Sequence, residues 1–352
     1  MRIAIVRLTS LGDVVHTLPV AAALRRHRPG DHIIWIVEEH EQVLVRDNPV
    51  VDEIVVVPLR RWLQLVKGGR PWRAAREMRD AARRLKALGA DTIIDVQGWG
   101  HKTSPIVAAT HAPTRVGFAR GYARDVWSTL FTTVHVTPPP AAVHVVDQNL
   151  ALLGPLGIND ARATFVLPRW PGAAARVDGW LADHHIADRS PIALLPSTRG
   201  PKKLWPAQSY SRLGAALAEE TGLPVVFAGG PIDKRVLEAV EGAAPPKGLF
   251  TYAPDEVGEL SALLGRAALV IGNDTGPLHL AAAAEVPTLG LFGPTSGARN
   301  GPYGRSSMFI QSPTRSMRDI PVEAVLEKAR RMLAERNVGD RDRQASRRLG
   351  RD

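Results

Sequence analysis

The 352-residue sequence contains no cysteine and no long apolar run. The absence of cysteine excludes a disulfide framework, thiolate metal sites and a cysteine nucleophile, and it fits a reducing compartment. No uninterrupted apolar stretch approaches the ~20 residues needed to span a bilayer. The N-terminus enters a short strand pattern directly and lacks the pattern of a secretory signal peptide. We therefore expect a soluble, globular protein.

Several motifs with known chemistry are also missing. The eleven histidines show no His-x-x-x-His or His-Glu-x-x-His spacing that a third ligand supports. There is no Gly-x-Ser-x-Gly elbow and no Walker A loop, so serine hydrolysis and P-loop phosphoryl transfer lose support. We therefore expect neither a metal site nor a cofactor.

What the chain has in excess is positive charge, with a net charge of +10 and much of it from arginine. One interpretation is attraction to polyanions such as nucleic acid, an anionic membrane face, or phosphorylated lipids and sugars. The other is an arginine-rich composition that places solvated charge on helix faces and in a basic tail. Composition alone leaves both interpretations open.

Strand and helix patterns alternate in both halves of the chain, which predicts βαβ units and parallel sheets. Strands are expected at 3–8, 33–37, 54–57, 92–96, 192–195, 225–228, 269–271 and 288–292. Helices are expected near 14–26, 72–88, 143–153, 207–220, 234–239, 257–264, 278–284 and 322–334. We predict an α/β protein whose two domains, at 1–165 and 166–336, face one cleft. The charged tail 337–352 lacks apolar periodicity and is predicted to be disordered.

The first strand runs into Thr9-Ser10-Leu11-Gly12-Asp13, a loop that leads into a helix. Ligands of open α/β sheets bind outside the carboxyl ends of the strands, so this loop is a candidate site. Only Gly12 is present of the glycines that a dinucleotide fingerprint needs. Asp13 is either an ordinary capping residue or a general base for a hydroxyl in a cleft. The sequence leaves these two interpretations open.

A second junction, Gly272-Asn273-Asp274-Thr275-Gly276-Pro277, follows the strand at 269–271. It predicts a capped helix start with proline in the first turn. Free N–H groups and the helix dipole favour phosphate at such a terminus. Gly276 lets a ligand approach the backbone, and His279 lies one turn into the helix. We interpret this junction as a phosphate- or sugar-binding turn.

Two further loops follow strands of the second half. Residues 196–206 carry hydroxyls and cations, and Lys203 is either a counter-charge for a departing diphosphate or part of a solvent-exposed basic loop. Gly229 and Gly230 follow the strand at 225–228, where a nucleotide could lie against bare backbone. In the first half Arg60, Arg61, Arg120 and Arg124 form a group that suits an anionic acceptor, because arginine grips phosphates and carboxylates bidentately.

In combination these blocks resemble the ADP-heptose–lipopolysaccharide heptosyltransferases of glycosyltransferase family 9. Residues 9–19, Thr-Ser-Leu-Gly-Asp-Val-Val-His-Thr-Leu-Pro, are similar to the opening of that family. The blocks at 35–39 and 58–62 are most like heptosyltransferase I. The blocks at 196–206, 228–231, 272–283 and 290–295 are similar to the donor-side motifs in order and spacing. The resemblance runs from residue 1 to about 330.

The resemblance implies a GT-B fold, in which two Rossmann-like domains surround a cleft and the C-terminal one holds the donor. It implies inverting, metal-independent transfer of L-glycero-D-manno-heptose from ADP-heptose to the Kdo of lipid A–Kdo. It implies that Asp13 is the catalytic base and that Lys203 faces the donor diphosphate. The implied donor-binding residues are Ser10, Gly12, Ser197, Thr198, Gly229, Gly230, Asp274, Thr275, Gly276 and His279. The implied acceptor-binding residues are Arg7, Arg60, Arg61 and Arg120.

A basic face would also let a cytoplasmic enzyme attach reversibly to the anionic inner face of the inner membrane. Three alternatives accompany this prediction. The first is heptosyltransferase II or a relative that acts on another core sugar. The second is a non-catalytic nucleotide-sugar binding protein, against which the retained Asp13 argues. The third is a nucleic-acid binder, suggested by a pI near 10.3. We expect no nucleic-acid partner, because a recognition module and an aromatic stacking platform are missing.

Overall fold

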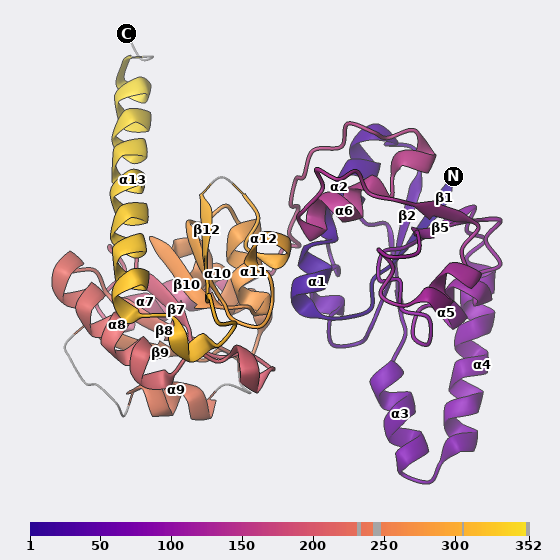
Figure 1. The fold of residues 1–352 in the computed structure, drawn as a ribbon, viewed down its shortest axis with the longest axis horizontal. Coiled ribbons are helices and arrows are strands. Elements are labelled where there is room, and N and C mark those ends of the chain that lie inside the picture. The colour runs from indigo at the N-terminus through magenta and orange to yellow at the C-terminus, as the bar shows by residue number, and fades with distance from the viewer. Residues whose placement is uncertain (231–233, 242–247, 305, 350–352) are drawn as a thin grey trace. The chain divides into compact units, whose positions relative to one another are not determined.

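The computed structural model describes residues 1–230, 234–241, 248–304 and 306–349 of the chain. It divides into two compact units, Met1–Arg169 and Trp170–Asp352, each with its own parallel sheet (Figure 1). The boundary lies four residues after the predicted end of the first domain at residue 165. Among the described residues, no helix is both long and apolar enough to cross a membrane.

The first unit consists of a six-stranded sheet and six α-helices among its described residues. Its strands are β1 (Arg2–Val6), β2 (His32–Val37), β3 (Glu53–Val56), β4 (Thr92–Asp95), β5 (Thr114–Phe118) and β6 (Val134–Val136). Its helices are α1 (Leu11–Val15), α2 (Leu18–His27), α3 (Leu59–Lys67), α4 (Pro71–Ala87), α5 (Ser104–Ala109) and α6 (Val145–Ala151).

The second unit repeats this plan. Its strands are β7 (Ile192–Leu195), β8 (Val225–Ala228), β9 (Leu249–Tyr252), β10 (Leu269–Asn273), β11 (Thr288–Phe292) and β12 (Ser307–Gln311). Its described helices are α7 (Ala173–Asp183), α8 (Ala207–Thr221), α9 (Lys234–Glu241), α10 (Val257–Arg266), α11 (Gly276–Ala283), α12 (Gly297–Asn300) and α13 (Val322–Leu349).

Both sheets have the strand order of a doubly wound Rossmann fold. The order is β3-β2-β1-β4-β5-β6 in the first unit and β12-β11-β10-β7-β8-β9 in the second. The two orders are the same when β7 is counted as the first strand and the second sheet is read from its other end. Every neighbouring pair is parallel. In such sheets ligands bind where the strand order reverses. The reversal lies between β1 and β4 in one unit and between β7 and β10 in the other, so the loops after these four strands are candidate sites.

The second sheet is buried on both faces, as its continuous apolar strands predict. Successive residues of β7 belong to different cores, because side chains alternate between the faces of a strand. Ile192 and Leu194 pack with α8 and α13, whereas Ala193 and Leu195 pack with α7, α10 and α11. This two-sided burial holds the strand ends rigidly, which lets short loops carry a precise site.

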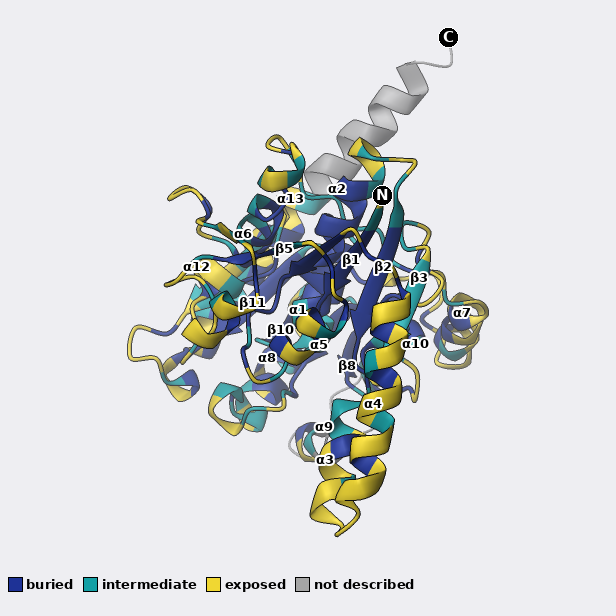
Figure 2. Ribbon diagram, turned by 90° about the vertical axis from the view of Figure 1, so that its right-hand side faces the viewer, coloured by how far each residue is buried: buried dark blue, intermediate teal, exposed yellow. Residues whose placement is uncertain are grey.

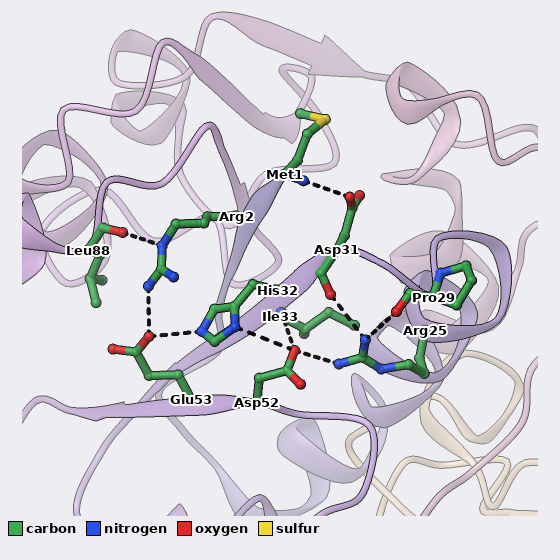
Figure 3. Close-up of polar contacts among 10 residues, drawn as sticks. All are labelled: Met1, Arg2, Arg25, Pro29, Asp31, His32, Ile33, Asp52, Glu53 and Leu88. Atoms are coloured by element: carbon green, nitrogen blue, oxygen red, sulfur yellow. Dashed lines mark hydrogen bonds and ion pairs between the residues drawn. The ribbon is translucent and has the colours of Figure 1, made fainter.

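A polar network lies at the end of the first sheet where its strands begin, opposite the candidate loops (Figure 3). Arg2 donates from Nε to the carbonyl oxygen of Leu88 at 2.6 Å and from Nη2 to Glu53 at 2.8 Å. Nε2 of His32 lies 3.0 Å from the same Glu53 carboxylate. These contacts join the starts of β1, β2 and β3 at the edge away from the candidate loops, so we assign them a structural role.

The predicted central strands are confirmed, but four strands were missed: β5, β6, β9 and β12. All four lie at or beside a sheet edge and are partly exposed, so they do not form continuous apolar runs. The prediction of a disordered tail at 337–352 also differs from the structure, since α13 continues to Leu349. Arginine recurs there and has high helix propensity. Residues 350–352 lie outside the described part of the chain.

Candidate active site

In the first unit, Asp13 lies in the short helix that follows the loop after β1. Its Oδ1 lies 2.6 Å from Nη2 of Arg7. Its Oδ2 accepts hydrogen bonds from the backbone N–H and the hydroxyl of Ser10, at 3.1 and 3.0 Å. The side chain of Asp13 keeps 35% of its surface exposed, whereas that of Arg7 keeps 8%. A buried cation therefore orients a carboxylate that stays accessible.

The environment of Asp13 keeps it ionised. Burial on its own would raise the pKa of Asp13, but the charge of Arg7 and the hydrogen bonds from Ser10 outweigh it and lower the pKa below its usual value. The capping interpretation holds in part, since Asp13 accepts the N–H of Ser10, the N-cap residue of α1. The general-base interpretation stays a prediction. A carboxylate of low pKa is a weak base, so it would take a proton as the new bond to the hydroxyl oxygen forms.

Arg7 was expected to bind the acceptor, and the structure gives it other partners. Its Nη1 donates to the carbonyl oxygen of Val96 at 3.1 Å, while Nη2 pairs with Asp13. With both terminal nitrogens engaged and the side chain buried, Arg7 acts as a positioning residue for Asp13.

This role predicts a change in pH dependence. If Asp13 is the general base, kcat/KM should fall when Asp13 of the free enzyme is protonated. In Arg7→Met the lowering effect of the charge is lost and the raising effect of burial remains, so the acid limb is expected to move to higher pH. Arg7→Lys keeps a cation and is expected to stay near the wild-type profile. An unchanged acid limb in Arg7→Met would contradict the assignment.

The loop after β4 lies beside the loop after β1, and sequence analysis did not single it out. Oε1 of Gln97 accepts the backbone N–H of Leu8 at 2.9 Å, which ties the two loops together. Asp95, at the end of β4, accepts from Thr103 Oγ1 at 2.8 Å and from the N–H of Gly98 at 3.0 Å. Burial raises the pKa of Asp95 despite these bonds. Asp95 therefore shapes the loop from inside.

The Trp99 ring of this loop carries two cations, Lys102 from the same loop and Arg124 from the loop after β5. Nζ of Lys102 lies 3.6 Å and the guanidinium carbon of Arg124 lies 4.0 Å from the centre of the Trp99 ring. Burial, then the charges of Arg124 and Arg60, lower the pKa of Lys102. Within the described residues neither Lys102 nor Arg124 forms an ion pair with a carboxylate. Two crowded cations of this kind suit a carboxylate or phosphate ligand. Lys102 lies six residues beyond the predicted strand at 92–96, whereas Arg124, which the sequence analysis groups with Arg120, follows a strand that was not predicted.

The predicted acceptor arginines have separate environments. Arg60, in the first turn of α3, pairs with Glu41 at 2.8 Å and with Glu38 at 3.5 Å. Arg61 pairs with Glu77 of α4 at 2.8 Å. Arg120 is exposed in the loop after β5. The charge of Arg60 thus acts on Lys102 beside Trp99. Arg61 instead pairs with the neighbouring helix.

In the second unit, Asp274 is the centre of a hydrogen-bonded cluster after β10. Its Oδ2 accepts from Nζ of Lys203 at 2.6 Å and from Oγ1 of Thr295 at 2.8 Å, and its Oδ1 lies 3.4 Å from Nε2 of His279. Oγ1 of Thr198 donates to the Asp274 carbonyl oxygen at 3.1 Å. Burial alone would raise the pKa of Asp274, but His279 and Lys203 hold it well below its usual range.

Asn273 joins the loops after β7 and β10. Its Nδ2 donates to the carbonyl oxygen of Pro196 at 2.8 Å, and its Oδ1 accepts the N–H of Trp205 at 3.2 Å. Lys203 lies between these anchors, and its side chain is 33% exposed. Ser197 Oγ is buried and has no hydrogen-bond partner among the residues that the structure describes. The loop therefore presents a held cation at the reversal point of the sheet.

The remaining predicted residues fall into three groups. Thr275 is the N-cap of α11 and Gly276 its first residue, so both adjoin Asp274. Gly229 and Gly230 lie on the next loop, after β8, where the N–H of Gly229 donates to the Tyr252 carbonyl oxygen at 3.2 Å. Ser10 and Gly12, predicted with the donor set, belong to the first unit beside Asp13. Thr295 was not named as a site residue, although it ends the block at 290–295 that resembles a donor-side motif.

No three His, Asp or Glu side chains of the described residues gather as they would around a metal ion. What the two units do offer is an accessible carboxylate at one reversal point and a lysine held by an aspartate at the other. Two Rossmann-like units with the same strand order have the architecture of the GT-B fold.

The sequence model of glycosyltransferase family 9 (heptosyltransferase) matches residues 78–329, and the chain belongs to this family. It is similar to lipopolysaccharide heptosyltransferase 1 of Pseudomonas aeruginosa, with 29% identity over 93% of this chain and 87% of the relative. The heptosyltransferase 1 of Escherichia coli is 27% identical over 93% of this chain and 99% of the relative. Family and relatives together identify an enzyme of heptose transfer in lipopolysaccharide core synthesis.

Solved structures agree on the fold. E. coli heptosyltransferase WaaC with ADP superposes with a TM-score of 0.76 at 23% identity, covering 94% of this chain and all of that one. E. coli ADP-heptose heptosyltransferase II gives a TM-score of 0.74 at 19% identity, over 96% of this chain and 100% of that one. The predicted α/β fold of two Rossmann-like domains is confirmed, whereas the predicted cleft between them stays a prediction.

Proposed function

We propose that the chain transfers L-glycero-D-manno-heptose from ADP-heptose to the Kdo of lipid A–Kdo, as heptosyltransferase I does. The observation that carries the proposal is the accessible, ionised Asp13 at the reversal point of the first sheet, in a chain most similar to heptosyltransferase 1 proteins. Donor binding is supported by solved relatives whose names include ADP and an ADP-heptose analogue.

The proposed reaction is a direct displacement with inversion and needs no metal. Asp13 accepts the proton of the acceptor hydroxyl, whose oxygen forms a bond to the anomeric carbon of heptose. The bond from that carbon to the diphosphate oxygen breaks, and ADP leaves with the electron pair. Lys203 supplies positive charge to the departing diphosphate, which is the task of a cationic clamp. The proposal requires both units to reach one substrate.

The acceptor is proposed to bind to the first unit. Its carboxylates or phosphates would be held by the cations at Trp99, with Arg60 and Arg120 as further candidates. Such an acceptor lies in a membrane, so we also propose a cytoplasmic enzyme that attaches reversibly to the anionic inner face of the inner membrane.

The test is transfer by purified protein with ADP-heptose and deacylated Kdo₂-lipid A in EDTA. We expect ADP release and a product mass raised by one heptose, which would establish both the reaction and its independence of metal. ADP-heptose binding without product would favour the alternative, heptosyltransferase II or a relative that uses another core sugar. No binding and no transfer would contradict the proposed substrates.

A further inference from the structure

Helices α3 and α4 form an antiparallel pair that extends away from the sheet of the first unit (Figure 1). α3 begins after β3, and residues 68–70 connect it to α4. The inner residues Trp62, Ala74, Ala81 and Leu85 pack into the core. The outer turns are exposed almost throughout (Figure 2). We call this pair, residues 59–87, the α3–α4 hairpin.

Both helices of the hairpin expose large apolar side chains. Leu63 is 59% exposed, Val66 49%, Trp72 66% and Met78 43%. Leu63 and Val66 stand three residues apart in α3, so they are neighbours on its surface. Trp72 lies in the first turn of α4, just beyond the connection. An exposed group of apolar residues near a tip marks a surface that another body covers.

The same hairpin is strongly basic. Residues 60–86 include ten basic and two acidic residues, a net charge of +8 in a chain whose net charge is +10. On α4, Trp72, Arg76, Arg79 and Arg83 follow one another at steps of four, three and four residues, which places them on one face. Ala74, Ala81 and Leu85 lie on the buried face, so the arginine face points to solvent.

We infer that the α3–α4 hairpin is the surface by which the enzyme docks on an anionic lipid bilayer. Trp72, Leu63 and Val66 enter the boundary between headgroups and acyl chains, and the arginine face contacts anionic headgroups, as in interfacial amphipathic helices. Exposed aliphatic side chains can be buried among acyl chains, whereas the phosphate backbone of a nucleic acid offers no apolar surface to bury them. The inference rests on the proposed function for its lipid acceptor, but its test uses neither donor nor transfer.

The experiment is co-sedimentation with phosphatidylcholine vesicles, with and without phosphatidylglycerol. We expect the protein to bind the mixed vesicles and to be released by salt. The variant Arg76→Gln, Arg79→Gln, Arg83→Gln should lower binding on the order of 100-fold, since each basic residue near such a surface contributes about 1 kcal/mol. Trp72→Ala should lower binding roughly tenfold through loss of apolar burial.

Matched control variants distinguish binding through the hairpin from non-specific binding to vesicles. Trp127, in the loop after β5, is also 66% exposed, so Trp127→Ala should leave binding unchanged. The variant Arg162→Gln, Arg169→Gln, Arg189→Gln removes the same charge from exposed positions elsewhere and should cost much less. All hairpin variants should keep the wild-type melting temperature and their activity on the deacylated acceptor.

Three results would overturn the inference: hairpin variants that bind vesicles like the wild type, a loss confined to Trp127→Ala, or binding of random oligonucleotide that the same hairpin variants abolish. Lipid binding by a protein without heptosyl transfer would keep the docking surface and reject the proposed function. Heptosyl transfer by a protein that does not bind lipid would keep the proposed function and reject the docking surface.

Discussion

Replacing Asp13 by asparagine is expected to lower the transfer rate by about 10²- to 10⁴-fold, the usual contribution of a general base, and to leave ADP-heptose binding intact. Asparagine keeps the size of the side chain and an oxygen for the N–H and hydroxyl of Ser10. It cannot take a proton from the acceptor hydroxyl and it loses the ion pair with Arg7. The measurement is single-turnover transfer together with calorimetric titration of the donor.

The control is Asp160→Asn, because the side chain of Asp160 is 87% exposed and should be replaceable without effect. A melting temperature close to the wild type would show that loss of the Arg7 pair has not unfolded the first unit. Activity of Asp13→Asn within tenfold of the wild type would reject Asp13 as the base. Equal loss of donor binding and of turnover would assign Asp13 to binding instead.

The central strands could be predicted from the sequence because both faces of each are buried. β1, β7 and β10 appear as short β-branched or aliphatic runs, and the loops that follow them were found by position alone. The strands nearer the edges mix in residues such as Arg115, Gly117 and Ser307. Pairing with a neighbour, rather than local sequence, makes these segments strands, and pairing cannot be read from composition.

The sequence predicted those residues of the candidate site that follow a recognisable strand. Asp13, Lys203 and Asp274 follow strands and were selected for that reason. The expected acceptor role of Arg7 stays a prediction, but its partners could not be foreseen, because an arginine at a strand end can turn inward or outward and its burial against Asp13 depends on β4 beside it. The meeting of Lys102 and Arg124 at Trp99 became visible only once the strand order placed β4 beside β5. Helix α3 was missed because most of its residues face solvent.

Lys203 and Asp274 are expected to act as one unit in catalysis. Lys203→Met should lower kcat/KM for the donor by about 10²- to 10³-fold, comparable with the loss of one group that stabilises charge in a transition state. Asp274→Asn should cause a loss of similar size, because it removes the charge that holds the Lys203 ammonium at 2.6 Å. Thr295 and His279 contact the same carboxylate, so its loss also loosens the loop around it.

The test is a double-mutant cycle on kcat/KM, with ADP affinity measured on the same four proteins. If the aspartate works by positioning the lysine, the double variant should lose little more than the worse single variant, since residues that act as a unit are non-additive. Lys202→Met is the matched control, because Lys202 is the adjacent lysine and is exposed. Fully additive losses, or an equal loss in Lys202→Met, would mean that positive charge on the loop matters in general and that the pair with Asp274 does not select Lys203. Non-additive losses with ADP affinity nearly unchanged would place the action of the pair in the transition state, where the diphosphate gains charge as its bond to heptose breaks.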